Sequence, residues 1–248
     1  MDKPVYLVAG ASSGMGRAAA RKLGQSHGHV ICAARRLEAC EVLADDIRSA
    51  GGSAEALQFD GTDAASVKAM IGAIDAAHGR LDGAFNNLGD TLGSGPLHDT
   101  ALERWADSLA VNLSSVFYLM HAQVPLMLRA GKGRIVNNSS TAGLKGIAGM
   151  ADYSAAKWGV IGLTKSAALD YAAQGLVINV IAPGIIATEK FEQFETMMPE
   201  LFEKLREETP AQRFGTMDEI AQTVDWLLRE APPYLTGQVL PIDGGRTA

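Results

Sequence analysis

The sequence predicts an α/β protein with a doubly wound parallel sheet of seven strands and helices on both faces. Short apolar or β-branched runs recur along the chain, and each is followed by a longer segment with a helical pattern. Such alternation indicates a parallel sheet that is covered on both sides. The 248 residues show neither a linker nor an internal repeat, so we expect a single domain over residues 1–248.

The N-terminal half accounts for four strands. Each strand is read from a short apolar run, and Gly51-Gly52 ends the second helix. The expected strands are Val5–Ala9, His29–Ala34, Ala54–Phe59 and Leu81–Asn86. The expected helices are Met15–Gln25, Leu37–Ala50 and a third that Thr62 caps and that continues to His78.

The C-terminal half continues the pattern with three strands and four helices. One helix, the acidic segment Glu189–Glu208, has an irregular apolar pattern. The expected strands are Gly133–Asn138, Leu176–Ala182 and Gln238–Ile242. The other expected helices are Glu103–Arg129, Met150–Gln174 and Asp218–Arg229.

Composition excludes several classes of protein. With 22 Lys and Arg against 28 Asp and Glu, the net charge is −6, which disfavours binding to nucleic acid or to an anionic membrane. The apolar run Val5–Ala9 is too short for a signal peptide, and no run approaches the roughly 18 residues of a membrane span. We therefore expect a cytoplasmic protein.

Cysteine and histidine spacing predicts neither a disulfide framework nor a metal site. Two cysteines, Cys32 and Cys40, are too few for a framework and are expected as free thiols. The five histidines share no metal-ligand spacing: His27, His29, His78, His98 and His121.

A glycine-rich loop, Gly10-Ala11-Ser12-Ser13-Gly14-Met15-Gly16, joins the first strand to its helix. Glycines let a backbone turn tightly and approach a pyrophosphate, and the helix N-terminus adds free N–H groups and a positive dipole end. Because the loop follows a strand and opens a helix, it predicts dinucleotide binding. The alternative is a glycine-rich turn without a ligand.

The end of the second strand bears on which dinucleotide binds. A carboxylate there would favour NAD, whereas a cation would favour the 2′-phosphate of NADP. The chain has Ala34-Arg35-Arg36, with no carboxylate before Glu38. Arginine pairs with phosphate in a bidentate fashion, so Arg35 and Arg36 predict NADP, with NAD as the less favoured cofactor. The alternative is two solvated arginines.

A second motif, Tyr153-Ser154-Ala155-Ala156-Lys157, places a phenol and an ammonium on one helix face. A nearby ammonium favours the phenolate, and an acid–base tyrosine results. Ser140 ends a strand 13 residues earlier, where its hydroxyl can hold a substrate oxygen. Asn112 lies inside a long apolar helix, which indicates a local kink or a water site. Packing alone remains the alternative reading of Tyr153 and Lys157.

Together these motifs resemble those of the short-chain dehydrogenase/reductase family, in its compact form of about 250 residues, over essentially the whole chain. The resemblance implies a Rossmann-like fold and a catalytic tetrad. The matching stretches are Gly10–Gly16, Asp60, Asn86-Asn87-Leu88-Gly89, Asn112, Ser139-Ser140, Tyr153–Lys157, Pro183–Thr188 and Gly237–Gly245.

The resemblance also implies a role for each site residue. Ser140 would position the substrate, Tyr153 would be the acid–base, Lys157 would hold the nicotinamide ribose, and Asn112 would anchor a relay water. The implied cofactor-binding residues are Gly10, Ser12, Ser13, Gly14, Met15, Gly16, Arg35, Arg36, Asp60, Gly61, Asn87, Leu88, Gly89, Tyr153, Lys157, Pro183, Gly184, Ile186 and Thr188.

Within these implied roles, Asp60 and Gly61 would contact adenine, and Asn87 and Gly89 the ribose on the adenosine side. Ile186 and Thr188 would contact the nicotinamide amide. Two positions depart from the family pattern: Ala9 replaces a threonine that braces the asparagine loop, and Leu88 replaces an alanine.

The expected function is an NADP(H)-dependent oxidoreductase that moves a hydride between nicotinamide and a carbonyl or secondary alcohol of a small molecule. One alternative is a 3-oxoacyl carrier-protein reductase, although two positions that commonly dock the carrier hold the neutral Gly131 and Gln174. Another is a catalytically silent NAD(P)-sensing protein, which the complete tetrad disfavours.

We also expect a substrate lid over about 189–214 and a homotetramer. The alternative for the lid is a plain amphipathic helix. Its apolar residues are Phe191, Phe194, Met197, Met198 and Phe202. The tetramer would form through the helices around Asn112–Arg129 and Ala151–Gln174, with a second patch near Val239–Ile242.

Overall fold

Seven parallel strands form one sheet in the order β3-β2-β1-β4-β5-β6-β9, as expected. The computed structural model describes residues 3–26 and 28–248, with the side chains of residues 190 and 192–194 and all of His27 outside this description. The strands are β1 (Val5–Ala9), β2 (His29–Ala34), β3 (Ser53–Gln58), β4 (Gly83–Asn86), β5 (Gly133–Asn138), β6 (Leu176–Pro183) and β9 (Val239–Ile242).

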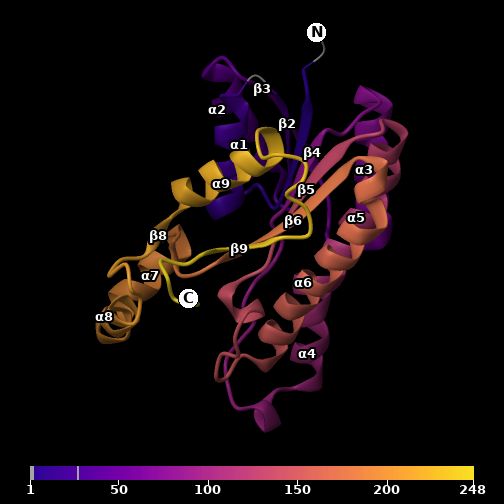
Figure 1. Cartoon of the computed structure of the whole chain (residues 1–248). Coiled ribbons are helices and arrows are strands. Elements are labelled where there is room, and N and C mark those ends of the chain that lie inside the picture. The colour runs from indigo at the N-terminus through magenta and orange to yellow at the C-terminus, as the bar shows by residue number, and fades with distance from the viewer. Residues whose placement is uncertain (1–2, 27) are drawn as a thin grey trace.

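Helices cover both faces of this sheet (Figure 1). One face carries α1 (Gly14–Gly24), α2 (Leu37–Ser49) and α9 (Met217–Arg229). The other carries α3 (Ala64–His78), α5 (Ser115–Arg129) and α6 (Ala151–Tyr171), with α4 (Leu102–Leu109) packed against α6. The doubly wound architecture is therefore confirmed.

Alternation along the strands produces two separate cores. Leu7 and Ala9 of β1 pack with α3, α5 and α6, whereas Tyr6 and Val8 pack with α1, α2 and α9. Successive side chains of a strand point to opposite faces. A strand buried on both sides therefore reads as the continuous apolar run seen in the sequence.

The long helix expected over Glu103–Arg129 is interrupted. A π-helical turn, Ala110–Ser114, separates α4 from α5 and contains the buried Asn112. The Asn112 Nδ2 donates to the carbonyl of Ser108 at 3.1 Å and to that of Asp90 at 2.9 Å. The local irregularity expected at Asn112 is thus present. The prediction of one continuous helix is wrong.

Two other expectations are corrected. Asp63, not Thr62, caps α3, because the Asp63 carboxylate accepts the N–H of Ala65 at 2.9 Å while Thr62 bonds to Asp60. The segment expected as one helix over Glu189–Glu208 forms α7 (Glu189–Met197) and α8 (Pro199–Glu207), because Pro199 begins a new helix. The remaining boundaries agree within three residues.

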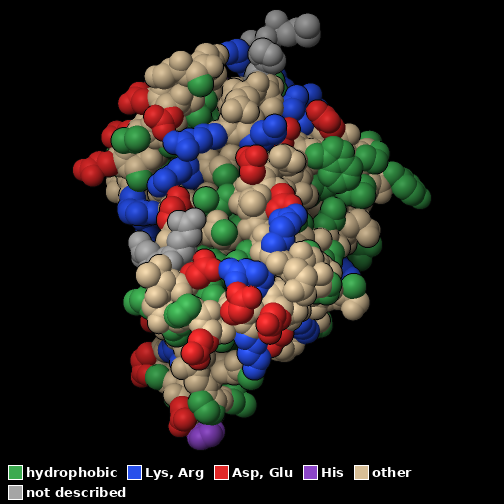
Figure 2. Space-filling view, turned by 90° about the vertical axis from the view of Figure 1, so that its left-hand side faces the viewer, with side chains coloured by type: hydrophobic (Ala, Val, Ile, Leu, Met, Phe, Trp, Pro, Cys, Tyr) green, Lys and Arg blue, Asp and Glu red, His purple; other side chains and the backbone are tan. Residues whose placement is uncertain are grey.

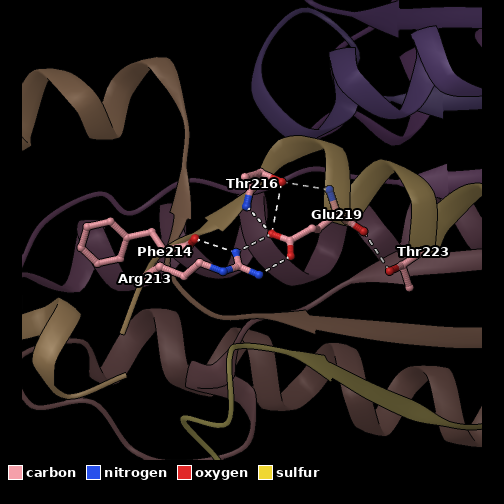
Figure 3. Close-up of polar contacts among 5 residues, drawn as sticks. All are labelled: Arg213, Phe214, Thr216, Glu219 and Thr223. Carbon is pink, nitrogen blue, oxygen red and sulfur yellow. Dashed lines mark hydrogen bonds and ion pairs between the residues drawn. The ribbon is translucent and has the colours of Figure 1, made fainter. Parts of the chain in front are cut away.

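A second, two-stranded sheet of β7 (Ile186–Ala187) and β8 (Gly215–Thr216) was not expected. These strands frame α7 and α8 and lead into α9. At the start of α9, Thr216 and Glu219 form a capping box, and the Arg213 guanidinium pairs with both Glu219 oxygens at 2.7 and 3.0 Å (Figure 3). These hydrogen bonds lower the pKa of Glu219 to about 2.

A buried polar network ties the sheet to the helices behind it. Asn86 of β4 exchanges hydrogen bonds with Gln123 of α5, at 2.8 and 3.1 Å, and donates to Asn137 of β5 at 2.9 Å. Asn137 in turn donates to Thr164 of α6 at 2.9 Å. All four side chains are fully buried. The network fixes α5 and α6 against β4 and β5.

The surface shows mixed charge on the face that carries α1, α2 and α9, where acidic and basic side chains are interspersed (Figure 2). Among the residues that the structure describes, no helix is both long enough and apolar enough to cross a membrane.

Candidate active site

The site lies at the carboxyl ends of the strands, where the chain reverses direction across the sheet. β1 pairs with β2 on one side and with β4 on the other, so the loops after β1 and β4 diverge there. Such a switch point is where open α/β sheets bind ligands. A cavity of about 300 Å³ opens here. Its lining includes Gly10, Ser12, Ser13, Arg35, Arg36, Asp60, Gly61, Asn87, Leu88 and Gly89.

The glycine loop after β1 is built for close backbone approach. A Cβ on Gly10 would lie 2.5 Å from the Asn87 carbonyl oxygen, and Gly10 has a φ of +87°. A Cβ on Gly16 would lie 2.1 Å from the carbonyl oxygen of Gly10. Ser13 precedes α1 but makes no side-chain cap. The first N–H groups of α1 therefore face the loop, and this cradle suits a pyrophosphate.

Arg36, more than Arg35, is joined to the glycine loop. The Arg36 guanidinium donates to the hydroxyls of Ser12 and Ser13 at 3.0 and 3.1 Å. Arg35 lies at the same cavity, close enough to Asp60 to help lower its pKa. The larger causes of that lowered pKa are the two hydrogen bonds that Asp60 accepts from Thr62. The structure thus brings both predicted cations and Asp60 to one cavity.

Asn87 is braced although Ala9 lacks a hydroxyl. Its Oδ1 accepts from Asn138 at 2.8 Å, and its Nδ2 donates to the Gly10 carbonyl at 3.4 Å. Sequence reasoning missed Asn138, whose only signal is its place directly before the two serines that follow β5. Leu88 fills the space beside Gly61, where an added Cβ would lie 2.3 Å from a Leu88 methyl carbon. The departure at Leu88 is therefore accommodated by a glycine opposite it.

A second cavity, of about 790 Å³, continues from the glycine loop to the second motif. Ser140, Tyr153 and Lys157 line it, as does Asp90, which sequence reasoning also missed. Its lining also includes Ser13, Gly14, Met15, Arg36, Asn87, Leu88, Gly89, Asn138, Pro183, Gly184 and Thr188. Ile186 lines neither cavity, because its side chain packs into the core beneath α1 and α9.

Lys157 is a buried ammonium beneath this cavity. It is 1% exposed, and its Nζ donates to the carbonyls of Asn138 at 3.1 Å and Leu88 at 3.4 Å. Burial lowers the pKa of Lys157 to about 8. The Nζ lies 5.5 Å from the centre of the Tyr153 ring, as expected for residues one helical turn apart.

The pKa of Tyr153 is shifted in the opposite direction to the one expected. Burial raises the pKa of the Tyr153 phenol, and a hydrogen bond with Ser140 only partly offsets this effect. The reason is that desolvation by burial disfavours the phenolate more than the Ser140 hydrogen bond favours it, and the nearby Asp90 disfavours it further. The expected depression of this pKa by Lys157 is therefore absent from the protein alone.

Asn112 and Lys157 meet at Gly89. A Cβ on Gly89 would lie 2.7 Å from the Asn112 Oδ1 and 2.8 Å from the Lys157 Nζ. The Asn112 Oδ1 also accepts the N–H of Asp90 at 3.0 Å. Asn112 lines neither cavity, so it holds the loop after β4 rather than facing the open space.

Known proteins resemble this chain over its full length. The family model described as enoyl-(acyl carrier protein) reductase matches residues 10–247. Cyclohexanol dehydrogenase of Acinetobacter sp. (strain SE19) is 38% identical over 247 residues, which cover 100% of this chain and 96% of that protein. A 3-oxoacyl-(acyl-carrier-protein) reductase of Staphylococcus aureus is 38% identical over 240 residues, 96% of each chain.

A solved structure is likewise similar to this chain over its whole length. The crystal structure of a variant of actinorhodin polyketide ketoreductase with NADPH superposes with a TM-score of 0.93 at 31% identity, covering 100% of this chain and 99% of that one. The fold and the site thus define a Rossmann-like, NAD(P)-dependent oxidoreductase. The chain belongs to the short-chain dehydrogenase/reductase family.

Proposed function

We propose that this enzyme uses NADP(H) to interconvert a carbonyl and a secondary alcohol on a small molecule. One observation carries the proposal: Ser140, Tyr153 and Lys157 line the same cavity as residues of the glycine loop. A phenol and a hydroxyl that share a cavity with the glycine loop support acid–base chemistry beside a bound dinucleotide. The dehydrogenase and reductase activities named for the relatives support this reading.

Each residue then has a chemical task. A bound nicotinamide supplies or accepts the hydride. The Ser140 hydroxyl holds the substrate oxygen, and the Tyr153 hydroxyl donates a proton to that oxygen in reduction or accepts it in oxidation. Lys157 brings a positive charge close to the Tyr153 ring and would hold the ribose of a bound cofactor. Asn112 acts indirectly, because it holds Gly89 and Asp90 in place.

Replacing Tyr153 with Phe tests this proposal, because it removes only the phenolic oxygen and its proton. We expect turnover to fall by about 10²–10⁴-fold or more, with NADPH binding retained. Ser154→Ala, which alters the neighbouring residue, is the control. Activity of the Phe variant within threefold of the parent contradicts the assignment. A parent that binds NADPH but reduces no carbonyl in a broad panel would instead indicate an NAD(P)-sensing protein.

Cofactor choice rests on Arg35 and Arg36 beside Ala34. Two cations and no carboxylate at this end of β2 favour the 2′-phosphate of NADP. In Ala34→Asp/Arg35→Ala, loss of a charge-assisted contact should weaken NADP(H) binding by roughly 10- to 100-fold. The measurement is KM for both cofactors, with Arg21→Ala as the control, because Arg21 of α1 pairs with Asp46 of α2 and lines neither cavity. A parent that prefers NADH, or an unchanged preference in the variant, refutes the proposal.

We propose that residues 189–214 form the substrate lid. Phe191, which lines the larger cavity, packs against Phe202 and Phe214, with ring centres 4.5 and 4.8 Å apart. An ion pair of 3.3 Å between Arg17 and Glu189 joins the start of α7 to α1. The side chain of Phe194 lies outside the described residues.

Reduction of a carrier-bound 3-oxoacyl group is the second candidate function, because one relative carries that name. Gly131 and Gln174 still offer no cation for an acidic carrier, and the exposed Lys132 lies 4.0 Å from Asp82. Comparing turnover of an acyl carrier-protein substrate with that of a free ketone distinguishes the two functions.

A further inference from the structure

A cluster of three potential metal ligands lies at the opposite end of the sheet from the glycine loop. His29 begins β2, Glu55 lies in β3, and His78 ends α3. One ligand atom from each lies within 4.8 Å of the other two. Because β2 is six residues long, the cluster is separated from the carboxyl end of the sheet by roughly 17 Å.

The fold brings these residues together through strand register and helix periodicity. His29 pairs with Ser53, and Ile31 pairs with Glu55, in parallel register. Ile31 packs into the core against α3, so His29, two residues earlier on the strand, points to the same face. His78 follows the buried Ile74 by one helical turn and therefore also faces β2 and β3.

Two of the ligand distances bracket the separation that a small divalent cation requires. The Glu55 Oε1 lies 3.6 Å from the His29 Nε2 and 2.8 Å from the His78 Nε2, and the shorter contact is a hydrogen bond that a bound metal would replace. Around a tetrahedral zinc with bonds near 2.0–2.1 Å, neighbouring ligand atoms are about 3.4 Å apart. The two imidazole rings are 4.8 Å apart between centres and inclined by 41°, so neither blocks the other.

The hydrogen bonds leave one ligand atom unsatisfied. The His29 Nδ1 lies 2.8 Å from the Ser53 hydroxyl, whereas the His29 Nε2 is buried and makes no hydrogen bond to the described residues, since the Glu55 Oε1 at 3.6 Å is beyond hydrogen-bond distance. If the Nδ1 donates to Ser53, the Nε2 presents a lone pair toward the Glu55 carboxylate. Two electron-rich atoms then face each other, and a cation between them would satisfy both. A metal-bound histidine commonly has its second nitrogen fixed in this way.

We propose that His29, Glu55 and His78 bind one zinc ion, with water at the remaining position. Two imidazole nitrogens and one carboxylate favour zinc or a similar transition metal over magnesium or calcium. The side chains are 19%, 37% and 21% exposed, which leaves a path for the ion and its water. The ion would join β2, the edge strand β3 and the end of α3, and so stabilise the fold away from the reacting groups.

The test is a titration of zinc into the metal-free, untagged full-length chain by calorimetry, with thermal unfolding as a second readout. We expect one zinc ion per chain and an unfolding temperature that rises with zinc but not with magnesium. Loss of an orienting partner costs about 10–100-fold in metal affinity, so Ser53→Ala should weaken binding by that factor. Glu55→Gln and His78→Gln should weaken it further.

His98→Gln, at an exposed histidine outside the cluster, is the matched control and should bind zinc like the parent. Circular dichroism of each variant establishes that it is folded. The proposal is overturned if the parent shows no saturable zinc binding up to about 100 μM, or if folded Glu55→Gln and His78→Gln variants bind unchanged. Turnover with chelator present should equal that without it, so the result is independent of the proposed catalytic roles.

Discussion

Lys157 is the residue at which function and stability oppose each other most directly. Its ammonium is buried, and the fall of its pKa from 10.5 to about 8 corresponds to roughly 3 kcal/mol against the charged form. Replacing Lys157 with Met should therefore stabilise the fold at pH 7, by roughly 1–2 kcal/mol after the loss of two hydrogen bonds, while abolishing turnover. Urea denaturation of parent and variant provides the measurement.

The pH dependence of this effect follows from the direction of the shift. Between pH 8 and 10.5 the unfolded lysine binds a proton that the folded lysine does not, so the parent gains stability as pH rises. The advantage of Lys157→Met is then complete below pH 8, and it is lost and reversed before about pH 10.5, because the parent regains roughly 3 kcal/mol over this range. A variant less stable than the parent at pH 7, or an advantage independent of pH, contradicts this account.

Sequence motifs predicted candidate site residues, but not how these residues titrate. The spacing of Tyr153 and Lys157 predicted that they share a helix face, because helical geometry alone determines it. The raised pKa of Tyr153 could not be predicted in this way, since it depends on burial by residues distant in the chain. Asn138 was missed for the same reason: its contact with Asn87 joins the last residue of β5 to the loop after β4.

At the scale of elements, the buried network of Asn86, Asn137, Gln123 and Thr164 determines how α5 and α6 sit on the sheet. Gln123→Leu would leave the Asn86 Oδ1 without its 2.8 Å partner. An unpaired buried polar group costs about 1–3 kcal/mol, so we expect the urea midpoint to fall by that equivalent at an unchanged m-value. Gln25→Leu, at an exposed glutamine, is the control. An unchanged midpoint for Gln123→Leu would show that the network contributes nothing.

Long elements were predicted well because their periodicity is strong, and short ones were not. β7 and β8 have two residues each, too few for any period to appear. The π-helical turn at Asn112 preserves a helical pattern on both sides, so the sequence indicated only the odd residue and not the break. The expected lid divides at Pro199, where proline favours a helix start.

At the scale of the whole molecule, the sequence could not indicate which distant residues meet. His29, Glu55 and His78 lack metal-ligand spacing, yet strand pairing and α3 bring them together. The cytoplasmic location, the absence of nucleic-acid partners and the tetramer stay predictions, because each concerns something outside the chain.

The tetramer prediction rests on apolar side chains that the chain leaves exposed on α5 and α6. Phe117 is 48% exposed, Trp158 52% and Leu169 85%. Leu169 also lines a cavity of about 570 Å³ that includes Gly237–Val239, next to β9. Phe117 on α5 and Leu169 beside β9 thus mark two apolar surfaces. Two such surfaces allow two-fold axes to combine into closed D₂ symmetry. Because α6 carries Tyr153 and Lys157, assembly should also support turnover.

One substitution on each surface should disrupt one interface at a time. Phe117→Glu and Leu169→Lys should each convert a particle of four 26.1 kDa chains into dimers and lower turnover, since α6 loses its support. Val42→Glu, at a side chain 62% exposed on α2, should leave the assembly intact. Light scattering after size exclusion gives the mass of each. A fully active parent monomer at micromolar concentration would rule the tetramer out, and variants that remain tetrameric would place its interfaces elsewhere.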